Sequence, residues 1–248
     1  AIVRSMLIFV EDTIVKYGWK VTAITDFIRN YAFARKIRKD IVVIPDGVDT
    51  SFFDPTRLDG GEMRFKYGIK KEEGLCIYAG RIDRNAGADI LIQAARLLSD
   101  KDVKLMIVGE GDSQLIDEFS KCHNIVHTGS ICREDVPKYL AAADIVLIPF
   151  PNNVASHSIS PLKLFEALSM EKPVVASAVS GIKEVLCGDF CGVLVSDDPK
   201  HWASAIMELI ESNVKDSHQG EKNRKLVLEK YDWDQLSEQF GMLIEDEV

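Results

Sequence analysis

The stretch SHSISPLKLFEALSMEKPVVAS, residues 156–177, decides the fold of this chain. It joins a polar loop to a helix expected over residues 161–170, and then to a short apolar strand expected over residues 173–176. Proline suits the first turn of a helix, where its missing N–H is harmless, and the serine before it is a favoured cap. The free N–H groups at this helix start, together with the side chain of Lys163, therefore favour binding of a phosphate group.

Glu166 lies on the otherwise apolar side of this helix, among leucine, phenylalanine and alanine residues. A charged group in such a place usually has a partner, because an unpaired charge is costly to bury. Two interpretations fit the stretch taken alone. Glu166 either marks the rim of a helix packed on a sheet or binds a ligand.

Outward from this stretch, apolar runs of strand length alternate with segments of helical periodicity. The expected strands cover residues 75–79, 104–108, 125–127, 145–150, 173–176 and 193–195. The expected helices between and after them cover residues 88–98, 113–122, 133–143, 161–170, 182–186 and 201–211. This alternation, with nearly continuous apolar strands, predicts an α/β fold with a doubly wound, parallel, Rossmann-like sheet covered on both faces.

The flanking segments carry further elements. We expect helices over residues 1–17 and 26–38, strands over 20–24 and 41–44, and two late helices over 221–230 and 234–244. Five basic residues lie on or just after the second helix: Arg29, Arg35, Lys36, Arg38 and Lys39. They form either a solvated face or a contact with an anionic lipid surface or a phosphate-bearing acceptor.

The composition is typical of a soluble globular protein, with 46% hydrophobic and 28% charged residues. A formal net charge of −9 argues against nucleic acid as a partner. Apolar runs stay far below the roughly 20 residues of a membrane span, and no signal-peptide pattern is visible. The five cysteines lack metal-ligand spacing, so we expect reduced thiols, no metal site and a cytoplasmic location.

Ligands of a doubly wound sheet bind at the carboxyl ends of its strands. Gly80, Gly109 and Gly129 each lie at or just after the end of an expected strand, where glycine allows close backbone approach. Each glycine taken singly also fits an ordinary tight turn. Arg81 offers a planar fork for phosphate oxygens, whereas a salt bridge with Asp83 is its structural alternative.

Other chemistries are disfavoured. Gly109 and Gly111 do not complete the dinucleotide fingerprint, because Gln114 stands where its third glycine would fall. His127 lies inside an apolar strand and is expected to be a packed core histidine. His157 lies in the loop before the helix expected to bind phosphate, and one hypothesis is that it contacts the ligand.

Several motifs together resemble a known family. They are VIPDGVD at 43–49, YAGR at 78–81, IVGEG at 107–111, AAAD at 141–144, FEAL at 165–168, KPVVA at 172–176, SGIKEV at 180–185, GVLV at 192–195 and Trp233. In this order and spacing they resemble the retaining glycosyltransferases of family 4, of the GT-B class. The resemblance runs from about residue 21 to about residue 240.

This resemblance implies two Rossmann-like domains with the active site between them, the second of which binds a nucleotide-diphosphate sugar. Residues 1–45 would end the N-terminal acceptor domain, 46–74 would form a hinge and linker, 75–230 the donor-binding domain, and 231–248 a C-terminal crossover helix. The fold would then be the C-terminal half of a GT-B fold. Most of the acceptor domain would be missing, so the chain alone is expected to bind donor without transferring sugar.

The resemblance also implies roles for single residues. Gly80 and Arg81 would face the diphosphate, the backbone around Ser130 would hold the base, and Glu166 would take the ribose hydroxyls. Glu166 and Arg81 are the expected catalytic residues, and no metal or other cofactor is required. The expected donor-binding residues are Gly80, Arg81, Arg84, Gly109, Gly111, Gly129, Ser130, Ile131, Ser158, Ser160, Pro161, Leu162, Lys163 and Glu166.

Three positions depart from the family pattern. Ser158 stands where a glutamate near the transferred sugar is usual. Ala86 replaces a usual lysine, whose charge Arg84 or Lys163 could supply. Glu171 replaces a usual glycine.

The expected function is that of the donor-binding part of a hexosyltransferase. Its expected partners are a GDP- or UDP-linked sugar, a glycan or lipid-linked acceptor and a missing N-terminal domain, with the inner membrane surface as one candidate location. The alternatives are a non-catalytic nucleotide-sugar-binding subunit and an epimerase-like protein.

Overall fold

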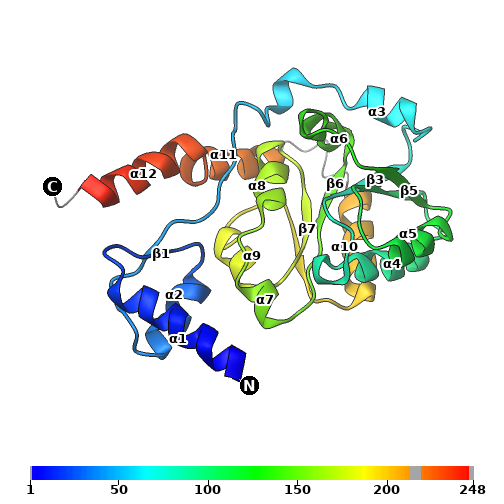
Figure 1. Cartoon of the computed structure of the whole chain (residues 1–248). Coiled ribbons are helices and arrows are strands. Elements are labelled where there is room, and N and C mark those ends of the chain that lie inside the picture. The colour runs from blue at the N-terminus through cyan, green and yellow to red at the C-terminus, as the bar shows by residue number, and fades with distance from the viewer. Residues whose placement is uncertain (1, 213–218, 246–248) are drawn as a thin grey trace.

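The computed structural model describes residues 2–212 and 219–245, and its main body is a six-stranded parallel sheet (Figure 1). The strand order is β5-β4-β3-β6-β7-β8. The strands are β3 Gly74–Ala79, β4 Val103–Val108, β5 Ile125–Gly129, β6 Ile145–Ile148, β7 Val174–Ser177 and β8 Gly192–Val195. The chain winds from β3 to one edge of the sheet and returns to β6 before it winds to the other. This order confirms the doubly wound, Rossmann-like prediction and places the topological switch between β3 and β6.

Helices cover both faces of this sheet. The observed segments are α4 Ala88–Leu97, α5 Ser113–Ser120, α6 Val136–Ala142, α7 Val154–His157, α8 Leu162–Ser169, α9 Ser180–Val185 and α10 Pro199–Glu211. The helix predicted from residue 133 begins with a 3-10 turn, η3 Arg133–Asp135, because Pro137 enters at the first turn of α6. The short helix α7 was expected to be loop, and Asn153 starts it by accepting a hydrogen bond from Ser156 N at 2.9 Å.

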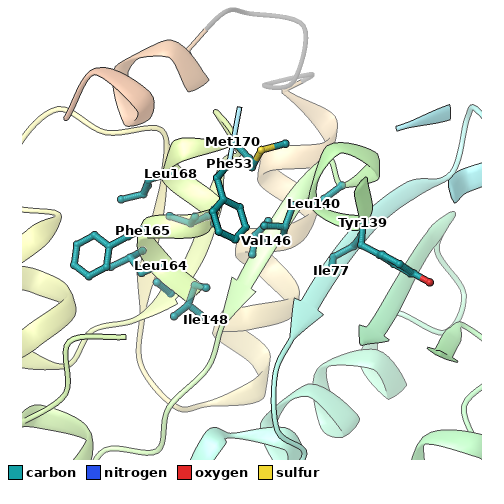
Figure 2. Close-up of a cluster of buried hydrophobic side chains, with 14 of the residues drawn as sticks. Phe53, Ile77, Tyr139, Leu140, Val146, Ile148, Leu164, Phe165, Leu168 and Met170 are labelled. Atoms are coloured by element: carbon teal, nitrogen blue, oxygen red, sulfur yellow. The ribbon is translucent and has the colours of Figure 1, made fainter. Parts of the chain in front are cut away.

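Two apolar layers hold the sheet. One layer contains Phe53, Leu164 and Phe165, and Figure 2 shows Phe53 among side chains of α8 and of neighbouring strands. The other contains Trp202 of α10 and Leu91 of α4. Because the central strands are apolar on both sides, both layers are needed to keep them from water.

Residues 2–43 form a small unit with its own core of Ala23, Ala32 and Ile41. It consists of α1 Ile2–Tyr17, β1 Thr22–Ala23, α2 Asp26–Ala34 and β2 Val42–Val43, and the two strands pair in parallel. Figure 1 shows it to one side of the main sheet.

The segment expected to be a linker, residues 46–74, contains two short helices, η1 Pro55–Arg57 and α3 Gly61–Lys66. They were not predicted because the segment is rich in glycine and charged residues. The chain returns to it after α11 Gly220–Lys230, where Val48 N donates to Tyr231 O at 2.9 Å and Trp233 N donates to Val48 O at 3.1 Å. From there α12 Trp233–Glu245 reaches toward the side of the small unit (Figure 1). Within the residues that the structure describes, no helix has the length and apolar character needed to cross a membrane.

Candidate functional site

Three glycines meet at the carboxyl ends of β3, β4 and β5. Gly80 N donates to Val108 O at 2.9 Å, and Gly109 N donates to Gly129 O at 3.0 Å. A Cβ on Gly109, whose φ is +138°, would lie 2.0 Å from Gly80 O. Similarly, a Cβ on Gly111 would lie 2.0 Å from Ile82 O. Gly109 and Gly111 are therefore required, first of all, by the close packing of the loops that form the floor of the site.

Lys163 lies at the centre of the candidate site, on the first turn of α8. Its Nζ donates to the Tyr78 hydroxyl at 3.2 Å and lies 4.3 Å from the centroid of the Tyr78 ring. The ring of Phe150 is 5.3 Å away. Burial lowers the pKa of Lys163 to about 8, while Glu166 and Asp83 oppose this shift. A cation is thus held in an aromatic enclosure beside Gly80.

Glu166 lies one helical turn after Lys163 and is half-buried. Burial raises the pKa of this carboxyl group, while the positive charges of Arg133 and Lys163 oppose that shift. Arg133 itself is exposed and lies over the ring of Phe52 at 6.0 Å. A carboxylate between two cations at the rim of the sheet is well placed to accept hydroxyl hydrogen bonds from a ligand.

Arg81 is exposed, with 82% of its side chain accessible, and its Nε lies 3.2 Å from Asp83 Oδ2. The predicted alternative, a surface ion pair with Asp83, is therefore present in this structure. Such pairs are weak, so this guanidinium can exchange partners when an anion arrives. Arg84 is exposed on the 3-10 turn η2 Arg84–Ala86.

The start of α8 differs by one residue from its prediction. Pro161 occupies the cap position without a side-chain cap bond, and the helix begins at Leu162. Ser160 does not cap this helix, because its buried hydroxyl accepts a hydrogen bond from Asp46 N at 3.2 Å instead. In consequence the first N–H groups of α8 receive no side-chain cap, which leaves them to a ligand or to water. The Leu162 side chain itself is exposed.

The side chains of Ser158 and His157 both have hydrogen-bond partners within the protein. Ser158 Oγ donates to Val154 O at 2.9 Å, so the residue that ends α7 bonds back to its first residue. His157 Nδ1 accepts from Ser180 N at 3.1 Å, and its Nε2 lies 2.8 Å from Asn152 Oδ1. These partners favour the structural interpretation of His157.

In the loop expected to bind the base, residues 129–131, one backbone N–H has a side-chain partner that the sequence did not predict. Ser130 N donates to Glu110 Oε1 at 3.3 Å, and Gly129 has a left-handed φ of +74°. Ile131 is half-buried against the core below the loop. His127 Nε2 lies 2.8 Å from Gly109 O, so this strand histidine fastens the floor of the site.

Sequence reasoning missed four residues around the site, namely Tyr78, Glu110, Arg133 and Phe150. Glu110 and Phe150 do follow strand ends, which is a usable signal, whereas Tyr78 reads as an ordinary strand residue. Among the described residues, no group of three His, Cys, Asp or Glu side chains could hold a metal ion.

The geometry defines a class first: a doubly wound α/β domain whose glycine-lined strand ends face a half-buried lysine and an uncapped helix start. A family model described as "Glycosyl transferases group 1" matches residues 73–212. The chain belongs to this family, the group 1 glycosyltransferases.

Individual relatives agree with this assignment. D-inositol 3-phosphate glycosyltransferase from Xylanimonas cellulosilytica is 30% identical over 185 residues, which are 68% of this chain and 43% of that protein. Sucrose-phosphate synthase from Thermosynechococcus elongatus has a similar fold, with a TM-score of 0.77 and 24% identity over 96% of this chain and 60% of that one. Alr3699/HepE from Anabaena, solved in complex with UDP, has a TM-score of 0.77 and 19% identity over 94% of this chain and 65% of that one. The chain thus spans less than half of the length of the D-inositol 3-phosphate glycosyltransferase from Xylanimonas cellulosilytica.

Proposed function

We propose that this chain is the donor-binding part of a glycosyltransferase that transfers a hexose, with retention, from a nucleotide-diphosphate sugar to a glycan or lipid acceptor. One observation carries the proposal most strongly: Lys163 Nζ is held 3.2 Å from the Tyr78 hydroxyl, beside Gly80 and at the uncapped start of α8. Backbone N–H groups, a helix dipole and an ammonium group converge there, which suits a diphosphate.

The roles of the site residues follow from their places. Lys163, Arg81 and the N–H groups of Leu162 and Lys163 bind the diphosphate, with Arg84 at the outer edge. Glu166 accepts the ribose hydroxyls. The backbone of residues 129–131 binds the base, which is uracil or guanine; bound UDP in Alr3699/HepE from Anabaena favours uracil. The positive groups stabilise the leaving diphosphate, so Arg81 and Lys163 act on the transition state.

We further propose that residues 1–45 are the end of an acceptor domain, that 46–74 are the hinge and linker, that 75–230 bind the donor, and that 231–248 cross back. A two-stranded sheet is marginal alone, and α1 exposes apolar side chains including Met6, Leu7 and Ile14. Additional strands of an acceptor domain would complete both. Arg29, Arg35 and Arg38 already form ion pairs with neighbouring aspartates, so contact of this unit with the inner membrane surface would depend on Lys36 and Lys39.

A second candidate is a non-catalytic nucleotide-sugar-binding subunit of the cytoplasm. Ser158, turned toward Val154 O, supports it because no carboxylate occupies that place. An epimerase-like protein remains the third.

Thermal denaturation with a panel of nucleotides tests donor binding. At one hundred times the dissociation constant, UDP or GDP should add about 2.7 kcal/mol of stability, whereas uridine or guanosine should add far less. Absence of a shift with every nucleotide diphosphate would refute the proposal. Sugar transfer after mixing with a separately supplied acceptor domain would favour the transferase over the non-catalytic subunit, and an isomerised sugar would identify the epimerase.

A further inference from the structure

Lys163 differs from the two arginines of the site because aromatic side chains enclose it. Arg81 and Arg84 are exposed, whereas Lys163 lies between the rings of Tyr78 and Phe150. Its charge is balanced at a distance by Glu166 on the same helix and by Asp83 after β3. A lysine in this setting needs a fixed hydrogen-bond acceptor, because burial disfavours its charged form.

Tyr78 supplies that acceptor. Its hydroxyl donates to Arg81 O at 2.5 Å, which uses its only proton and leaves an oxygen lone pair for Lys163 Nζ at 3.2 Å. Burial raises the pKa of Tyr78 far above its usual range, so the hydroxyl keeps that proton. One phenol group therefore fixes both the Gly80–Arg81 turn and the ammonium group.

Gly80 makes room for this arrangement. A Cβ on Gly80 would lie 3.0 Å from Lys163 Nζ and 3.3 Å from the Tyr78 hydroxyl, and its φ is +152°. The ammonium group thus reaches the end of β3 from α8.

We propose that Tyr78 is a positioning residue that holds Lys163 against the Gly80–Arg81 turn, and that nucleotide binding at this lysine is coupled to uptake of one proton at alkaline pH. This inference rests on the proposed function of the site. The proton comes from the buffer and binds to Lys163 Nζ as the diphosphate arrives.

The direction of the pH effect follows from the burial of Lys163. Because its pKa is lowered to about 8, a growing fraction of the ligand-free chain carries a neutral amine above that pH. A diphosphate favours the ammonium form, so affinity must fall as pH rises through about 8. The phosphate groups of the nucleotide stay fully ionised there, since the second phosphate ionisation lies at about pH 6. An ordinary solvated lysine, with a pKa of about 10.4, would leave affinity unchanged to about pH 9.

Calorimetric titration of the full chain with UDP and with GDP, at pH 7 and pH 9, tests the inference. We expect affinity to fall about tenfold between these pH values, with proton uptake at pH 9 revealed by buffers of different ionisation enthalpy. Tyr78→Phe should weaken binding about threefold to tenfold at pH 7 and move the fall to lower pH, because the ammonium loses its acceptor. Lys163→Arg should remove the fall, since guanidinium stays charged.

Tyr139→Phe is the matched control. Its hydroxyl is also hydrogen-bonded, to Tyr67 at 2.8 Å, but between α3 and α6, away from the site. The Tyr139→Phe variant should leave the nucleotide affinity and its pH dependence unchanged. Cys132→Ser is a second control, which removes an exposed thiol beside the base-binding loop and should also leave both unchanged. If the wild-type chain binds nucleotide and the Tyr78→Phe variant shows the same affinity and the same pH dependence, the inference is overturned and the proposed function stays intact. Failure of the wild-type chain to bind either nucleotide at pH 7 would overturn both. If Tyr78→Phe does not fold, absence of proton uptake by the wild-type chain overturns the inference.

Discussion

Glu184 Oε2 on α9 accepts a hydrogen bond from Asp26 N, at the start of α2, at 2.8 Å. Its Oε1 accepts another from Phe27 N at 3.0 Å. One carboxylate of the main sheet domain thereby satisfies two of the free N–H groups at the start of a helix in the small N-terminal unit. The negative charge also suits the positive end of the α2 dipole. This contact joins the small unit to the main sheet domain.

Replacing Glu184 with glutamine should therefore destabilise the chain. The amide keeps one acceptor oxygen but loses the second bond and the charge, a loss of about 1–2 kcal/mol. The melting temperature should fall by about 2–4 °C for each kcal/mol. Glu208→Gln, at an exposed position on α10, is the control and should change little. Equal melting temperatures for the two variants would contradict the role of this contact.

Replacing Arg81 with alanine should weaken nucleotide-diphosphate binding. Loss of a charge-assisted phosphate contact corresponds to about 1–3 kcal/mol, measurable by titration with UDP and GDP. Arg57→Ala removes another exposed arginine, which pairs with Asp54 at 3.1 Å away from the site, and should leave affinity unchanged. An unaltered affinity in the Arg81 variant would mean that Arg81 contacts no phosphate.

Replacing Glu166 with glutamine should distinguish the contribution of the ribose to binding from that of the diphosphate. UDP affinity should fall by about 1.5–3 kcal/mol, because hydrogen bonds to a carboxylate are strong. Inorganic pyrophosphate, which lacks the ribose, should bind the variant at least as well, since a negative charge near Lys163 has gone. Parallel titrations of both ligands check this. A similar loss for pyrophosphate would instead place Glu166 in the architecture of the phosphate site.

Replacing Gly109 with alanine should destabilise the fold severely, by about 3 kcal/mol or more. The added methyl group would lie 2.0 Å from the carbonyl oxygen of Gly80, at a φ of +138° that L-residues avoid. Denaturant unfolding measures the effect. Gly188→Ala, where the methyl group meets open space, should stay within about 0.5 kcal/mol of the wild type. A mild effect at Gly109 would show that the loops can separate.

The sheet could be predicted because its strands are short, apolar and separated by amphipathic helices. Even so, the predicted β6 extended past its observed end at Ile148, since Pro149 interrupts pairing. The predicted cap at Ser160 was wrong for a different reason. Its hydroxyl bonds to Asp46 N, which lies more than a hundred residues earlier in the chain, and local cap preferences carry no information about such a partner.

The amino-acid sequence by itself determined the alternation of strands and helices, and hence the edge where Gly80, Gly109 and Gly129 meet, because hydrophobic periodicity is a local property of the chain. Its motifs also indicated the family. Only the tertiary structure brought Lys163 of α8 to the hydroxyl of Tyr78 in β3, and Glu184 of α9 to the first turn of α2. Those contacts depend on how distant segments pack, and packing lowered the pKa of Lys163 by removing its water.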